Sequence, residues 1–210
     1  MCGETGFNRT DPDLPRAEDR TAPKQTPIRP CAFTVDVERV VRDLDGHPAW
    51  DRHTPRKTIQ PELNPHTEMS DIWVRFNAWE NFHGDLRAMC APHKSVWYPV
   101  ADEVPALRLL VNDVLAHLGP VELGMVLITR LPPGGKINPH VDGGWHAAYY
   151  NDKYAVQLQG NAEQSFNFQN HWISPNPGEV FWFDNSQLHW VFNDSSEDRM
   201  TMIICTRKIG

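Results

Sequence analysis

The run EVFWFDNSQLHWVFNDSSEDRMTMIICT, residues 179–206, decides the expected fold. It holds three short apolar segments, at residues 179–183, 190–193 and 200–206, and clusters of Asp, Asn and Ser separate them. Such clusters favour turns, and short segments rich in Val, Ile, Phe and Trp between turns are typical of strands. This part of the chain is therefore predicted to be a series of short strands joined by tight connections.

The same pattern of short apolar segments between turn residues extends back to Gly119. Three more short segments precede the quoted run, at residues 124–131, 154–159 and 165–169. Several short strands at this spacing predict a mainly β fold, either a double-sheet jelly roll or a small barrel.

One helix and one strand stand out in the amino half. Between residues 104 and 118 the apolar residues recur at intervals of three and four, which predicts an amphipathic helix covering one sheet. Asp102 is a candidate N-cap, and Gly119-Pro120 ends the helix. Residues 71–77 alternate between apolar and polar, which predicts a strand with one buried face.

The first thirty residues differ in composition from the rest. From residue 10 to residue 30 the chain is mostly Pro, Arg, Asp, Glu, Lys and Thr, which cannot bury enough apolar surface to offset the entropy of ordering. We therefore expect residues 1–30 to form a flexible N-terminal tail. Residues 31–210 have the length of a single jelly-roll domain.

Composition limits the partners. The formal net charge is −7, and Lys and Arg are scattered, so nucleic acid is not an expected partner. No run of eighteen apolar residues and no leader-like start is present, so we expect no membrane association and a cytoplasmic location. The four cysteines are far apart without a CxxC pair, which favours reduced thiols. The oligomeric state is not predicted.

The segment LPPGGKINPHVD, residues 131–142, carries the first candidate metal ligands. In extended backbone, His140 and Asp142 lie on the same face, because side chains two apart share a face. His189, immediately before the segment at residues 190–193, supplies a third ligand. Two imidazoles and one carboxylate suit non-haem Fe(II), whose other coordination positions stay open for a chelating co-substrate and dioxygen.

Arg199 adds a candidate anion-binding group. It stands ten residues after His189 and opens the last apolar segment. A guanidinium at the mouth of such a pocket is suited to bind the distal carboxylate of 2-oxoglutarate through two parallel hydrogen bonds.

Two runs, PPGGKINPHVDGGWHAAYY from residue 132 and WISPNPGEVFWFDNSQLHWVFNDSSEDRMTMII from residue 172, contain these four residues. With their spacing, the runs resemble the aspartyl/asparaginyl beta-hydroxylase family of Fe(II)/2-oxoglutarate-dependent oxygenases over about residues 120–206. The resemblance implies a cupin-like double-stranded β-helix with a few flanking helices. It also implies a catalytic centre in which His140, Asp142 and His189 bind the iron and Arg199 holds 2-oxoglutarate.

The resemblance implies weaker assignments as well. Thr129 occupies a position similar to that of a hydroxyl residue that often shares the 2-oxoglutarate carboxylate. Members commonly have a basic residue or His on the strand that corresponds to residues 153–159. Ala155 departs from this pattern, which leaves Gln157 as the best candidate there for a co-substrate contact. Asp142 fills the position that halogenases leave to chloride, so hydroxylation is expected.

By this resemblance the chain is expected to be a hydroxylase that acts on a C–H bond of an amino acid, free or within a peptide, and produces succinate and CO2. The substrate would be a small molecule or a peptide. Two alternatives stay open: an oxygenase that tailors a small natural-product scaffold, and a metal-binding or sugar-binding jelly roll without turnover. Arg199 argues against the second, because a simple binding protein has no need of a carboxylate anchor.

Overall fold

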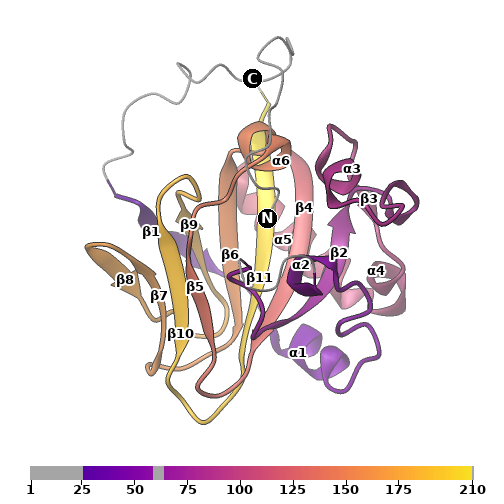
Figure 1. Cartoon of the computed structure of the whole chain (residues 1–210). Coiled ribbons are helices and arrows are strands. Elements are labelled where there is room, and N and C mark those ends of the chain that lie inside the picture. The colour runs from indigo at the N-terminus through magenta and orange to yellow at the C-terminus, as the bar shows by residue number, and fades with distance from the viewer. Residues whose placement is uncertain (1–25, 59–63, 210) are drawn as a thin grey trace.

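Two antiparallel β-sheets form the centre of the protein (Figure 1). The structure, a computed structural model, describes residues 26–58 and 64–209. The larger sheet has, in spatial order, β1 (Ile28–Thr34), β9 (Glu179–Phe183), β6 (Asp152–Gln159), β11 (Arg199–Lys208), β4 (Val121–Leu131), β2 (Ser70–Phe76) and β3 (Val96–Trp97). The smaller sheet has β5 (Lys136–His140), β10 (His189–Asn193), β7 (Gln164–Phe168) and β8 (His171–Ile173).

The chain passes repeatedly between the two sheets from β4 onward. Strands β4, β6, β9 and β11 belong to the larger sheet, while β5, β7, β8 and β10 belong to the smaller one. This alternation, with antiparallel neighbours throughout, is the topology of a jelly roll, or double-stranded β-helix. The predicted mainly β fold is confirmed, and each strand predicted after Gly119 overlaps one of these strands.

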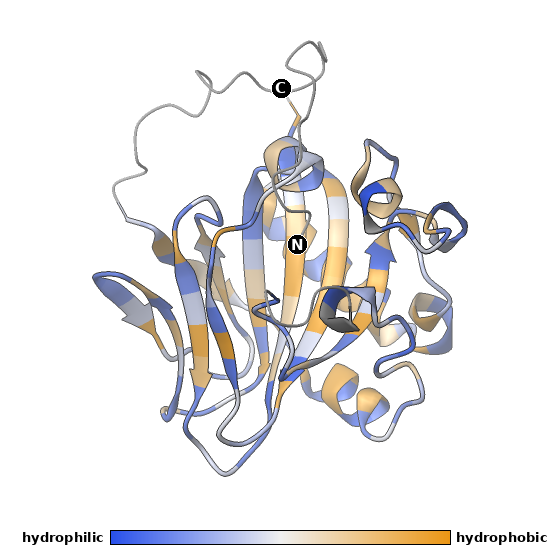
Figure 2. Cartoon of the chain, viewed as in Figure 1, coloured by the Kyte–Doolittle hydropathy of each residue, from blue (hydrophilic) through white to orange (hydrophobic). Residues whose placement is uncertain are grey.

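The outer face of the larger sheet is covered by helices. These are α1 (Glu38–Leu44), α4 (Val100–Glu103) and α5 (Ala106–Leu118), whose buried side chains join those of β4, β6 and β11 in one apolar cluster. Because both faces of this sheet are covered, strands β4 and β11 at its centre are hydrophobic along most of their length (Figure 2). Shorter elements are α2 (Pro55–Thr58), η3 (Trp79–Asn81), α3 (Leu86–Cys90) and α6 (Trp145–Tyr149).

The predicted long helix begins later than its pattern indicated. Asp102 is not its N-cap; it lies in α4, and α5 begins after Pro105. The residue before a proline disfavours helical backbone, and Val104 has φ −125° and ψ 80°, which interrupts the helix. The boundary of the predicted tail also needs correction, since β1 begins at Ile28; residues 1–25 lie outside the described residues.

Helix α5 offers a direct test of how the outer cluster stabilises the sheet. Leu107 is fully buried, whereas Leu109 on the same helix is 61% exposed. Leu107→Ala should lower the free energy of unfolding by about 2–5 kcal/mol, because it leaves a cavity under the sheet. Leu109→Ala is the matched control and should change it by less than about 0.5 kcal/mol. Chemical denaturation measures both, and equal effects would contradict the packing described.

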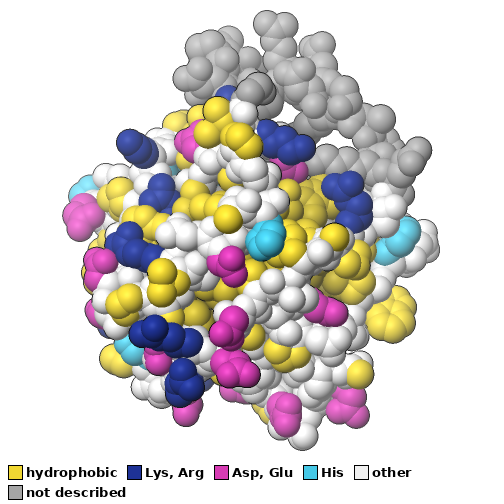
Figure 3. Space-filling view, turned by 180° about the vertical axis from the view of Figure 1, so that it is seen from behind, with side chains coloured by type: hydrophobic (Ala, Val, Ile, Leu, Met, Phe, Trp, Pro, Cys, Tyr) yellow, Lys and Arg dark blue, Asp and Glu magenta, His cyan; other side chains and the backbone are white. Residues whose placement is uncertain are grey.

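The surface charges, the helix lengths and the cysteines of the described residues are further features of the fold. Basic and acidic side chains are interspersed on the rear face (Figure 3). Among the described residues, no helix combines the length and hydrophobicity needed to span a membrane. Cys31 and Cys205 are free thiols.

Candidate active site

A cavity between the two sheets contains the predicted ligands. It is lined from the larger sheet by β4, β6 and β11 and from the smaller sheet by β5, β7 and β10. Alternation along β11 turns Arg199, Thr201 and Ile203 into this cavity, while Met202 and Ile204 join the helix-covered cluster on the other face. The cavity therefore occupies the inner face of the jelly roll.

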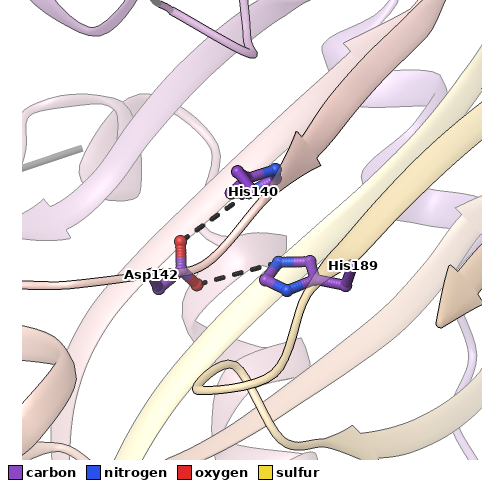
Figure 4. Close-up of side chains that lie close together, drawn as sticks. All are labelled: His140, Asp142 and His189. Atoms are coloured by element: carbon purple, nitrogen blue, oxygen red, sulfur yellow. Dashed lines mark ion pairs between the residues drawn. The ribbon is translucent and has the colours of Figure 1, made fainter. Parts of the chain in front are cut away.

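Strand pairing brings the two histidines together. His140 ends β5, His189 begins β10, and the two residues are directly opposite in the antiparallel ladder. Asp142 lies just beyond β5 and faces both rings (Figure 4). Its Oδ1 lies 3.8 Å from His140 Nε2, and its Oδ2 lies 4.0 Å from His189 Nε2. One potential ligand atom from each residue lies within 4.8 Å of the other two, which is compatible with a shared metal ion.

Hydrogen bonds set the orientation and tautomer of both rings. His140 Nδ1 donates to the Asn138 carbonyl at 2.7 Å, and His189 Nδ1 donates to the Gln187 carbonyl at 2.9 Å. A proton on Nδ1 leaves the Nε2 lone pair free, which is the usual state of a ligating imidazole. Burial lowers the pKa of His140 to about 4 and also lowers the pKa of His189. Both rings are therefore neutral near pH 7 and able to bind a metal.

Asp142 is ionised and paired with a buried lysine. Lys153 from β6 donates through Nζ to Asp142 Oδ2. Burial alone would raise the pKa of Asp142, but Lys153 and the two histidines outweigh it and hold the pKa well below its usual range. No sequence motif singles out Lys153. Its place on the inward face of β6 is the one local signal, because a lysine buried there needs a partner of opposite charge.

Arg199 brings an unpaired positive charge into the same cavity. It begins β11 and is 3% exposed, and among the described residues its Nε and Nη2 have no hydrogen-bond partner. Burial lowers its pKa to about 10, so the guanidinium stays protonated near pH 7. Buried donors without a partner are rare in proteins. A carboxylate bound by both nitrogens would satisfy them, so this site fits a dicarboxylic co-substrate.

The two weaker candidates for a co-substrate contact, Thr129 and Gln157, differ in their position relative to the cavity. Thr129 on β4 lines the cavity opposite Thr201, and its hydroxyl donates to the Thr201 carbonyl at 3.4 Å. Gln157 does not line the cavity. Its amide donates to the carbonyls of Gln159 and Met200, and its Oε1 accepts a hydrogen bond from Thr201. Co-substrate contacts from Thr129 and from Gln157 both stay predictions.

His66 is a residue of this region that sequence reasoning missed. It precedes β2, is 5% exposed, and packs edge-on against His140 with 4.8 Å between ring centroids. Neither ring nitrogen has a hydrogen-bond partner among the described residues. His66 also lines a second cavity, which lies on the side of Trp73, Phe76 and His146. No local pattern could have found it, because it stands in a polar segment without periodicity.

The jelly roll, the His-Asp-His cluster and the unpaired arginine define the class of protein: a hydroxylase that uses Fe(II), 2-oxoglutarate and dioxygen. The sequence model of the aspartyl/asparaginyl beta-hydroxylase family matches residues 54–208. The chain belongs to this family, which confirms the resemblance seen in its motifs. No match to a curated protein was found.

The chain is similar to several solved structures at low identity. A 2OG-Fe(II) oxygenase family oxidoreductase from Burkholderia pseudomallei is 14% identical with a TM-score of 0.47, over 68% of this chain and 69% of that one. The collagen prolyl hydroxylase of Paramecium bursaria Chlorella virus-1 is 12% identical with a TM-score of 0.47, over 89% and 98%. A Pseudomonas putida prolyl-4-hydroxylase is 15% identical with a TM-score of 0.44, over 89% and 95%.

Proposed function

We propose that the protein hydroxylates a C–H bond of an amino acid, free or within a peptide, and that His140, Asp142 and His189 bind the iron. Arg199 binds the distal carboxylate of 2-oxoglutarate, with Thr129 beside it. The observation that carries this proposal is the buried guanidinium of Arg199, which lacks a partner in the cavity that holds the three ligands. Iron held by these residues would supply the activation of dioxygen, with 2-oxoglutarate as the co-substrate that yields succinate and CO2.

The protein's own residues orient the metal-binding groups and exclude water from the cavity. Strand register and the two ring hydrogen bonds fix His140 and His189. The Asp142 backbone N–H donates to the Asn185 carbonyl at 3.0 Å, which fixes the main chain at Asp142. Phe166, Phe183 and Val191 line the same cavity and are buried. Apolar walls exclude water from the reacting groups and strengthen electrostatic interactions among them.

The second cavity supports an amino-acid substrate. It shares Arg56, His66, Asp142 and Lys153 with the first cavity, so a molecule bound in it lies next to the ligand cluster. Three cationic side chains line it, but Lys153 is paired with Asp142 and Arg56 is paired with Asp71, with 3.1 Å between Arg56 Nη1 and Asp71 Oδ2. Arg75 forms no ion pair among the described residues, and its Nε has no hydrogen-bond partner there, so Arg75 is the lining cation suited to bind a carboxylate of the substrate.

Product analysis tests the proposal. With Fe(II), 2-oxoglutarate and dioxygen, the purified protein should release succinate faster when L-aspartate, L-asparagine or a short peptide containing them is added, with one oxygen atom gained by that molecule. Mass spectrometry measures both products, and protein kept free of metal by a chelator is the control. Stimulation by a non-amino-acid scaffold alone would keep the hydroxylase class but overturn the substrate assignment.

A further inference from the structure

The ion pair between Lys153 and Asp142 connects the larger sheet to the ligand cluster. Both side chains are largely buried, with 11% and 14% of their surfaces exposed. The Lys153 ammonium lies 5.7 Å from the centroid of the Phe183 ring, so an apolar wall flanks it. A buried ammonium and a buried carboxylate in contact require each other, because either one alone would be an uncompensated charge.

The two oxygens of Asp142 have different neighbours. Oδ1 faces His140 and Oδ2 faces His189, but only Oδ2 is held by Lys153. Asp142 lies outside β5, so no strand ladder fixes its side chain. The hydrogen bond from its backbone N–H to the Asn185 carbonyl fixes the main chain but leaves the side chain free to rotate. Among the described contacts, the one with Lys153 restricts the orientation of the carboxylate.

We propose that Lys153 is a positioning residue that holds the Asp142 carboxylate toward the two imidazoles and thereby strengthens metal binding. This inference rests on the proposed role of Asp142 as an iron ligand. An opposing effect exists, because an ammonium repels a metal cation. The ammonium is already paired with the carboxylate, which offsets much of that repulsion, while loss of an outer-shell partner typically weakens metal affinity by about 10–100-fold.

Metal affinity measured without turnover tests the inference. Lys153→Met keeps the volume and the apolar stem but removes the charge. We expect it to weaken Mn(II) binding, followed by the electron paramagnetic resonance signal of the free ion, by at least about tenfold. Lys136→Met on β5 is the matched control, since Lys136 is exposed, and it should leave the affinity unchanged. Unchanged or tighter Mn(II) binding by Lys153→Met would overturn the inference.

Further variants show whether Lys153 acts through Asp142. Lys153→Arg keeps a donor for the carboxylate and should retain more Mn(II) affinity than Lys153→Met. In an Asp142→Ala background the effect of Lys153→Met should vanish, because the group it positions is gone. An equal effect in both backgrounds would overturn the inference. Circular dichroism verifies folding, and Lys153→Gln replaces Lys153→Met if the latter does not fold.

Failure of this inference is distinguishable from failure of the proposed function. If His140→Ala keeps full Mn(II) affinity, the metal centre itself is wrong. If His140→Ala loses Mn(II) while Lys153→Met binds it normally, the metal centre stands and the role of Lys153 is wrong.

Discussion

His189→Ala is expected to abolish iron-dependent succinate formation. The substitution removes one of the two neutral imidazoles whose Nε2 atoms face Asp142. Loss of a direct ligand should weaken Mn(II) binding by more than the roughly 10–100-fold typical of outer-shell changes. Turnover should fall below detection, because iron that is not bound at this site cannot support the reaction.

The control for this experiment is another histidine. His171 on β8 is exposed and does not line the cavity, so His171→Ala should keep both metal affinity and activity. His189 also stacks with Phe166, with 5.7 Å between ring centroids, and its loss can lower stability. Circular dichroism should therefore accompany the assay. A folded His189→Ala protein with normal activity would remove His189 from the proposed centre.

Arg199→Ala is expected to raise the concentration of 2-oxoglutarate required for half-maximal activity by at least about 30-fold. Truncating one partner of a buried, hydrogen-bonded charge pair typically costs about 2–5 kcal/mol, and each 1.4 kcal/mol is a factor of ten. Mn(II) affinity should change little, because Arg199 contacts none of the three candidate ligands through a hydrogen bond or ion pair in the described structure. Isothermal titration of 2-oxoglutarate into the Mn(II)-loaded protein measures the effect directly.

Two further variants define what Arg199 does. Arg207 lies on the same strand and is exposed, so Arg207→Ala should leave 2-oxoglutarate binding unchanged. Arg199→Lys keeps a positive charge but loses the planar pair of donors, so it should restore only part of the affinity. Equal losses of 2-oxoglutarate and Mn(II) binding in Arg199→Ala would contradict the anchor and indicate general damage to the cavity.

The contrast between the strands and the helix shows where local pattern is reliable. The segments at residues 179–183 and 190–193 appear almost unchanged as β9 and β10, because their length and their flanking turn residues are local properties. The start of α5 was misplaced because a proline, rather than a polar cap, decided where the helix begins. The apolar period of α5 was nevertheless right, since Leu107 and Val111 face the sheet and are fully buried.

The sequence and the tertiary structure likewise contribute different parts of the site. The sequence by itself predicted the strand-rich fold and singled out His140, Asp142, His189 and Arg199 as candidate site residues, because residue types and spacing are local information. Only the tertiary structure decided that β10 pairs with β5 in the register that sets His189 opposite His140. Sheet register depends on contacts between distant segments, which no local pattern reports.

The same reason explains Lys153 and His66. Each becomes part of the site through a neighbour distant in sequence or on another element: Lys153 through Asp142, and His66 through His140. A buried lysine looks like any strand residue until its carboxylate partner is placed beside it. Local sequence thus determined which groups are available for chemistry, while the folding of two sheets around one cavity decided which of them meet.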